Sequence, residues 1–190
     1  MTARPHQAQP ADAVQSGLIL PFRGKRPVIA PDAFIAPNAT LIGDTEIGAG
    51  SGIWFNCVLR GDGNYIRVGA RVNIQDGTIV HVSAKGWGTT IGDDVSIGHM
   101  ALIHACVLEP ESFVGMAATV MDGSVVESRA MVAAGALVTP GKRVKRGELW
   151  AGRPAKFIRE LTDDDYAMMT GTTVTYAQLA QAYRAEAAAR

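Results

Sequence analysis

The amino-acid sequence predicts an all-β solenoid, a parallel β-helix, with α-helices at its C-terminal end. The main observation is an aliphatic residue that recurs every six positions, and its longest run is Leu108, Val114, Val120, Val126, Val132, Val138 and Val144, followed by Trp150. Glycine often follows the aliphatic residue, and a small residue commonly stands four positions after it. A fixed short period of this kind is typical of repeats that stack only on their neighbours.

Shorter runs keep the same period nearer the N-terminus. They are Ile29 and Ile35; Ile47, Ile53 and Leu59; Val68, Ile74 and Val80; and Ile91, Ile97 and Ile103. We interpret the breaks between runs as loops or shifts of register, and three six-residue sides as one triangular coil. The alternating strands and helices of an α/β sheet are absent between residues 28 and 150, and so is a helical 3.6-residue period.

The chain divides into three predicted segments. Residues 1–17 are predicted to be a flexible tail because they are rich in proline, alanine and glutamine. The β-helix is predicted to occupy residues 18–155, and residues 156–190 to form a helical segment that packs against its side.

Two helices are expected in the last segment. Thr162 is placed to cap a helix whose first turn is acidic, and Gly171 is expected to end it. Thr175 and Tyr176 are expected to open a second helix that continues through about Ala187. Tyr176 and Tyr183 are interpreted as packing residues, although either could reach the mouth of a site.

Composition narrows the functional classes. The chain has 190 residues, of which 47% are hydrophobic, and it contains no apolar run long enough to cross a membrane. Its 18 basic and 18 acidic residues cancel, so no overall field attracts nucleic acid or an acidic membrane. Leu18–Leu20 is too short for the core of a signal peptide, which predicts a cytoplasmic protein.

Cys57 and Cys106 occupy small inward positions of the repeat and are interpreted as core residues without a disulfide.

Three of the four histidines lie inside the ladder, and their spacing predicts which of them can share a metal ion. His81 follows Val80, and His104 follows Ile103. If residues 85–89 bulge out of the ladder as a loop, Ile103 lies three sides beyond Val80, so that His104 lies one coil above His81. Because stacked strands are about 4.8 Å apart, two such imidazoles can converge on one ion with Zn–N bonds of about 2.0–2.1 Å.

His99 occupies a different place in the repeat. It stands two positions after Ile97, on another side, and is expected to point around a corner away from His81 and His104. A neighbouring copy of the chain could supply His99 to complete the site. The sequence therefore predicts a trimer with three shared metal sites at its interfaces.

These residues resemble the γ-class carbonic anhydrases. The resemblance covers residues 28 to about 165 and rests on Arg60-Gly61-Asp62, Asn73-Ile74-Gln75-Asp76-Gly77, His81, His99 and His104. It implies a left-handed β-helix, a homotrimer, and a metal ion held by three histidines from two subunits. The implied ion is zinc, with Fe²⁺ or Co²⁺ as alternatives, and the implied ligands are His81, His99 and His104.

The same resemblance implies an activity and gives roles to further residues. Three neutral ligands leave a dipositive ion its full charge and an open position, which lowers the pKa of bound water to about 7. The implied reaction is reversible hydration of carbon dioxide to bicarbonate through a metal-bound hydroxide. Gln75, accompanied by Asn73, would orient the hydroxide or a bicarbonate oxygen. Arg60, Asp62 and Asp76 would join subunits and preorganise the histidines, rather than form a solvated surface ion pair.

The sequence departs from the resemblance in one respect. The best-characterised branch of the family has an acidic loop that exports protons, whereas residues 82–90 contain no carboxylate, and Gly63 stands where the other shuttle glutamate would be. The chain is therefore more similar to the shorter bacterial branch. Two other functions stay open: a hexapeptide-repeat acyltransferase or thioesterase with a histidine base and no metal, and a non-catalytic metal-binding scaffold or assembly protein. Metal content separates the first of these from an anhydrase, and turnover separates the second.

Overall fold

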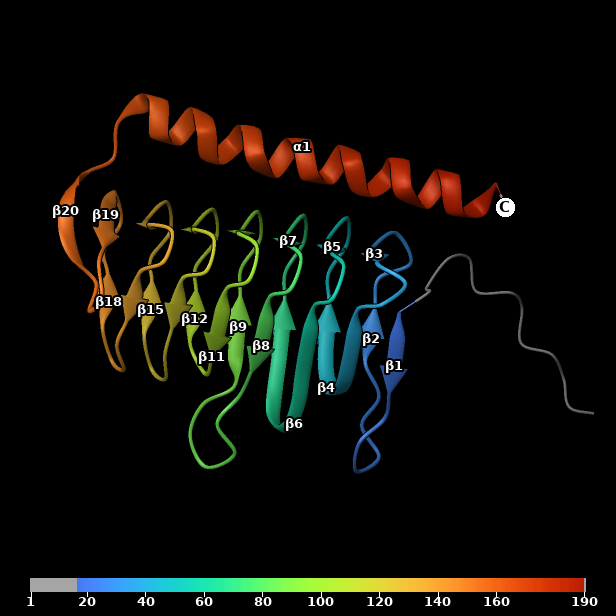
Figure 1. The fold of residues 1–190 in the computed structure, drawn as a ribbon. Helices are drawn as coiled ribbons and strands as arrows, with labels where there is room; N and C mark the ends of the chain where they lie inside the picture. The colour runs from blue at the N-terminus through green and yellow to red at the C-terminus, as the bar shows by residue number, and fades with distance from the viewer. Residues whose placement is uncertain (1–16, 190) are drawn as a thin grey trace, which may run out of the picture.

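The chain folds into a left-handed parallel β-helix with one long helix along its side (Figure 1). The structure is a computed structural model, and it describes residues 17–189. The fold class predicted from the six-residue period is therefore confirmed. The predicted flexible tail, residues 1–17, lies almost wholly outside the described residues, and the division into three segments stays a prediction.

Three faces, which we name A, B and C in chain order, build each coil. Face A is an eight-stranded sheet. It contains β3 (Phe34–Ile35), β5 (Gly52–Ile53), β7 (Asn73–Ile74), β10 (Ser96–Ile97), β13 (Phe113–Val114), β16 (Met131–Val132), β19 (Glu148–Ala151) and β20 (Lys156–Glu160). All of its pairs are parallel except β19 with β20, which closes the C-terminal end.

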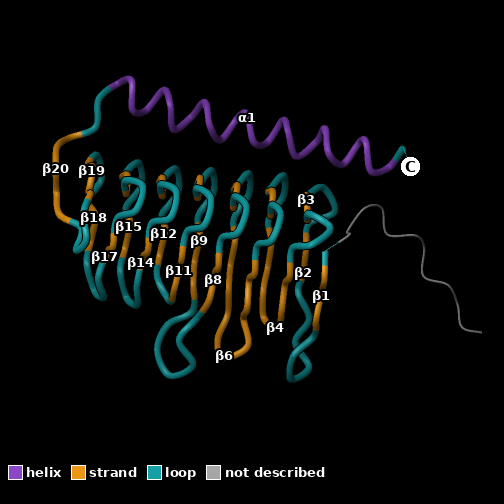
Figure 2. Tube along the Cα trace, viewed as in Figure 1, coloured by secondary structure: helices purple, strands orange, loops and turns teal. Residues whose placement is uncertain are grey.

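Faces B and C share two long strands, β4 (Thr40–Ile47) and β6 (Val58–Val68), which pass from one face to the other. Face B adds β1 (Leu18–Leu20), β8 (Ile79–His81), β11 (Leu102–His104), β14 (Thr119–Val120) and β17 (Leu137–Val138). Face C adds β2 (Val28–Ile29), β9 (Thr89–Ile91), β12 (Val107–Leu108), β15 (Val125–Val126) and β18 (Arg143–Val144). The turns between faces form three long edges of the prism, A–B, B–C and C–A (Figure 2).

The repeated aliphatic residues form the core. Val80, for example, pairs with Ile103, which pairs in turn with Val120, and all three are fully buried. Burying one such side chain stabilises the fold by about 1.5–3 kcal/mol, so the ladder fixes the register of every coil. The loop needed to keep this register lies between β8 and β9, as expected from the sequence. Cys57 and Cys106 are buried without a disulfide, and burial raises the pKa of each thiol to about 12.

The C-terminal segment contains one continuous helix, α1 (Asp163–Ala188). Thr162 caps it as predicted, since its hydroxyl accepts from the backbone of Asp165, whose carboxylate accepts from the Thr162 backbone. The predicted break at Gly171 is wrong. A glycine costs a helix only about 1 kcal/mol relative to alanine, and packing against face A on both sides of Gly171 outweighs this cost. No helix in the described part of the chain is long and apolar enough to cross a membrane.

Helix α1 runs back along the prism over face A, from the last coil towards the first (Figure 1). Tyr183 packs its ring 5.5 Å from that of Phe34 and 5.6 Å from that of Trp54, which confirms a packing role for this tyrosine. Near the helix end, Arg184 donates to the backbone carbonyl groups of Pro31 and Asp32. The helix thus spans most coils of face A.

A substitution at Gly43 would test how closely two coils approach each other at the corner between faces B and C. Its φ is +71°, and a Cβ there would overlap the carbonyl oxygen of Gly61. Gly135, with φ +67° and no heavy atom within 4 Å of its added Cβ, is the matched control. We expect Gly43→Ala to cost about 2 kcal/mol more than Gly135→Ala, or roughly 4–8 °C in melting temperature. Equal melting temperatures for the two variants would contradict the close approach.

Candidate metal centre

Two imidazoles face each other at the B–C edge. His81 ends β8, His104 ends β11, and the two residues are partners in the parallel pairing, as the repeat predicted. Nδ1 of His81 lies 3.2 Å from Nε2 of His104. Two nitrogens bound to one tetrahedral zinc ion at about 2.0–2.1 Å would be about 3.3–3.4 Å apart. The separation therefore fits two neighbouring ligands of one metal ion.

Each of these rings contacts a carboxylate through its other nitrogen. Nδ1 of His104 lies 2.7 Å from Oδ1 of Asp122, and Nε2 of His81 lies 3.2 Å from Oδ1 of Asp62. Arg60 in turn donates to Oδ2 of Asp62 at 2.6 Å. Carboxylates in this position fix which ring nitrogen carries the proton and leave the other nitrogen for the metal. The two nitrogens left over are the pair that face each other.

The carboxylate of Asp62 stays ionised in this setting. Partial burial raises its pKa, but hydrogen bonds from Arg60 and His81, together with the positive charge of Arg60, outweigh burial and hold the pKa below its usual value. Sequence reasoning anticipated Asp62 but missed Asp122. Asp122 lies 18 residues after His104, one coil further along the ladder, so counting coils could have found it.

His99 lies on the A–B edge, at the other side of face B. Its Nδ1 is 2.9 Å from Oδ2 of Asp76, and its Nε2 is 3.3 Å from the hydroxyl of Tyr176 on α1. Burial and the charge of Asp76 raise the pKa of Tyr176, so that its phenol keeps a proton it can donate. Within the described residues of a single chain, no group of three His, Cys, Asp or Glu side chains could hold a metal.

Gln75 and Asn73 belong to a buried series of hydrogen bonds beside the A–B edge. Nε2 of Gln75 donates to Oδ1 of Asn73 at 3.1 Å, and Nδ2 of Asn73 donates to the Ser96 hydroxyl at 2.7 Å. Ser96 Oγ lies 2.8 Å from Oγ1 of Thr173 on α1, which donates to the backbone of Met169 at 3.2 Å. If each hydroxyl in the series donates towards Met169, the series fixes the orientation of the Gln75 and Asn73 side-chain amides. Sequence reasoning missed Ser96 and Thr173.

The predicted residues therefore divide between two edges. Arg60 and Asp62 join His81 and His104 at the B–C edge. Asp76 lies instead with His99 and beside Gln75, so one chain does not bring Asp76 to the other two charged residues. The loop between β8 and β9 carries no carboxylate, and a Cβ at Gly63 would meet Cβ of Ala84 at 2.8 Å. A glutamate at position 63 would require this loop to move.

Known proteins resemble the chain in both sequence and fold. The family model "Bacterial transferase hexapeptide (six repeats)" matches residues 26–61. The crystal structure of a hexapeptide transferase family protein from Anaplasma phagocytophilum is 46% identical, with a TM-score of 0.84, and the match covers 87% of this chain and 98% of that one. The fold and these matches define a hexapeptide-repeat β-helix protein.

The curated relatives narrow this class. "Gamma carbonic anhydrase 1, mitochondrial" from Arabidopsis thaliana is 51% identical over 85% of this chain and 61% of that protein. "Carbonic anhydrase" from Geobacillus kaustophilus is 40% identical over 88% of this chain and 92% of that protein. The chain belongs to the γ-class carbonic anhydrase family. It spans about three fifths of the length of the plant relatives.

Asp122 tests how the His104 ring is held. Asp122→Asn keeps the size of the side chain but removes the charge that fixes the ring proton. Loss of such a partner typically weakens metal affinity about 10- to 100-fold. We expect this loss in competition titrations with a zinc chelator. Asp163→Asn, in the exposed first turn of α1, is the control and should bind metal like the parent protein. Equal affinity in both variants would rule out the proposed role of Asp122.

Proposed function

We propose that the protein is a metal-dependent γ-class carbonic anhydrase that converts carbon dioxide reversibly to bicarbonate. The observation that carries the proposal is the pair of ring nitrogens 3.2 Å apart on His81 and His104, each ring held by its own carboxylate. Relatives named as carbonic anhydrases support it, since they match 85–88% of this chain.

We propose His81 and His104 of one subunit and His99 of a second as the metal ligands, with Nε2 of His99 exchanging the Tyr176 hydroxyl for the metal. Zinc is the proposed ion, with Fe²⁺ or Co²⁺ as alternatives, because imidazole nitrogen suits each of these metals. A divalent ion held by three neutral imidazoles supplies hydroxide near neutral pH, because it lowers the pKa of bound water to about 7. The donor set fits this role, since the carboxylates of Asp62 and Asp122 leave one nitrogen of each facing ring available.

The remaining site residues hold the proposed ligands in place and orient the substrate. Gln75 commits one amide N–H to Asn73, so its carbonyl oxygen and second N–H are left to hold water or a bicarbonate oxygen. Asn73 acts as a positioning residue because Ser96 fixes its amide from the other side. Asp76 holds the His99 ring, while Arg60 holds Asp62 and through it His81. These contacts preorganise the site before substrate arrives.

We propose that the protein is a homotrimer, and the positions of the histidines support this. His99 is on one edge of face B, and His81 and His104 are on the other, so two copies that meet at these edges would complete a site. Exposed apolar side chains beside the A–B edge support such a contact: Met100 is 69% exposed, Met116 55% and Ile79 38%. Exposed apolar groups that gather in one region mark sites of association. Three copies related by a three-fold axis would contain three equivalent sites.

Acyl transfer is the second candidate function, and few observations favour it. The N-acyltransferase AntD from Bacillus cereus has a TM-score of 0.58 at 14% identity, which shows only a shared fold. A histidine base would not require two imidazoles that face each other.

A non-catalytic scaffold is the third candidate, since the loop between β8 and β9 lacks a proton-exporting carboxylate. The cytoplasmic location also stays a proposal, because three plant relatives are named as mitochondrial proteins.

Mixed trimers test whether each site is shared. His81→Ala and His99→Ala should each lose the site when purified alone. In a one-to-one mixture, every trimer that contains both variants would have one intact site, so roughly a quarter of all sites should return. The readout is zinc per chain after coexpression or joint refolding, with trimer mass confirmed by light scattering.

The matched control mixes His81→Ala with His104→Ala. Both changes fall on the same side of the interface, so no mixed trimer should regain a site. If the His81→Ala and His99→Ala mixture also recovered nothing while its trimers were intact, the shared site would be wrong. Full zinc binding by His99→Ala alone would lead to the same conclusion.

Turnover tests the reaction. We expect stopped-flow assays of zinc-loaded or anaerobically iron-loaded protein to show carbon dioxide hydration that His81→Ala lacks. Because the loop between β8 and β9 has no carboxylate to export protons, the rate should rise with the concentration of imidazole buffer until it saturates. A full metal complement without turnover at any buffer concentration would favour the scaffold over the enzyme.

A further inference from the structure

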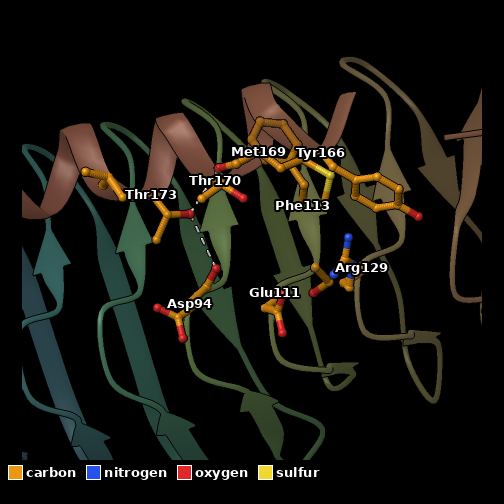
Figure 3. A pocket seen from close by; sticks show the side chains of 10 residues that line it. Asp94, Glu111, Phe113, Arg129, Tyr166, Met169, Thr170 and Thr173 are labelled. Atoms are coloured by element: carbon orange, nitrogen blue, oxygen red, sulfur yellow. Dashed lines mark hydrogen bonds between the residues drawn. The ribbon is translucent and has the colours of Figure 1, made fainter. Parts of the chain in front are cut away.

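A cleft of about 270 Å³ lies between α1 and the C–A edge of the prism. One wall contains Asp94, Glu111 and Arg129, and the other contains residues of α1 that include Tyr166 and Thr170 (Figure 3). None of the predicted metal ligands lines it. The cleft shares Thr173 with the hydrogen-bond series that begins at Gln75, but it contains none of the proposed ligands, and ligand binding in it does not depend on the proposed hydration activity.

Asp94, Glu111 and Arg129 hold equivalent corner positions in three successive coils. Each stands two residues before a strand of face A, and the three have φ of 58°, 61° and 58°. Adjacent coils are about 4.8 Å apart, so neighbouring corner side chains are within reach of one another. Arg71 and Asp94 use this proximity, with two short hydrogen bonds of 2.7 and 2.6 Å between guanidinium and carboxylate.

The next two corners do not pair in this way. The guanidinium of Arg129 lies over the ring of Tyr166, 4.3 Å from its centre, and no carboxylate of the described residues lies within 4.0 Å of it. The carboxylate of Glu111 likewise has no ion pair or hydrogen bond in the described part of the chain. An unpaired cation and an unpaired anion thus stand one coil apart on the same wall of the cleft.

The rest of the lining suits a small molecule with a short apolar part. Phe113, Met169 and Val174 supply apolar surface. Ser112 also lines the cleft, is 1% exposed, and has a hydroxyl that finds no hydrogen-bond partner among residues 17–189. Such a buried hydroxyl is costly unless something satisfies it. The volume is just below the range of about 300–1,000 Å³ typical of pockets for drug-sized ligands.

We propose that this cleft is a binding site for a small zwitterion of the α-amino-acid class. The carboxylate of the ligand pairs with Arg129, its ammonium group pairs with Glu111, and its apolar side chain packs against Phe113, Met169 and Val174. A zwitterion answers both unpaired charges at once, whereas a simple anion would be repelled by Glu111 and a simple cation by Arg129.

Three probes of matched shape test the proposal by isothermal titration calorimetry on the full chain. Leucine carries both charges, 4-methylpentanoate lacks the ammonium group, and 3-methylbutylamine lacks the carboxylate. We expect leucine to bind and each singly charged analogue to bind at least roughly tenfold more weakly, because each forfeits one charge-assisted contact. Failure of leucine to bind, or equal binding of 3-methylbutylamine, would overturn the proposal.

Variants locate the site. Arg129→Gln and Glu111→Gln should each weaken leucine binding roughly tenfold, while Arg26→Gln, at an exposed position before β2, should leave it unchanged. Melting temperatures within a few degrees of the parent would show that the variants are folded, and Arg129→Lys, which keeps the charge, provides a second folded variant that should bind more tightly than Arg129→Gln. Unchanged binding in both Arg129→Gln and Glu111→Gln would place leucine elsewhere and refute the assignment.

Discussion

The register of the stacked strands is the constraint on which the rest of the structure depends. Most coils contribute one buried aliphatic residue to each face, as Leu59, Val80 and Ile103 do on face B. A slip of one residue would turn every one of these side chains outward, so the register is strongly fixed. His81 and His104 each follow such a core residue directly, so the strand pairing alone places their rings beside each other. The ladder that holds the fold together also sets the distance between two proposed ligands.

The same register separates the proposed site into two halves that one chain cannot unite. His81 and His104 each end a face B strand and lie at the B–C edge, whereas His99, two positions past a face A strand, lies at the A–B edge. Because face B is rigid, no change of side-chain conformation brings the two edges together. Assembly of two copies would solve this problem. The second copy would place its A–B edge against the B–C edge of the first, and its His99 would supply the third imidazole. Under this proposal, the site is complete only in an oligomer.

Sequence reasoning was most successful where a local period determines the outcome. The ladder, the loop between β8 and β9 and the pairing of His81 with His104 all follow from counting six-residue sides, and the cap at Thr162 follows from local spacing. It failed where tertiary contacts decide. Gly171 does not end the helix because packing on face A outweighs its low propensity. The series of hydrogen bonds from Gln75 to Thr173 joins residues almost a hundred positions apart in the chain, so no local sequence pattern predicts it.

The two halves of the proposed site also differ in how firmly they are built. At the B–C edge the two histidines lie on ladder strands, the carboxylate of Asp62 lies on β6, and the carboxylate of Asp122 lies in a turn. The half at the A–B edge depends in addition on α1, through the hydroxyl groups of Thr173 and Tyr176. Along this helix only Met169 and Ala180 are buried, and aromatic and polar contacts supply the rest of its attachment. Since weakly packed elements open at lower free energy than core strands, small shifts of α1 would change the surroundings of His99 and Gln75 while the facing pair stays fixed.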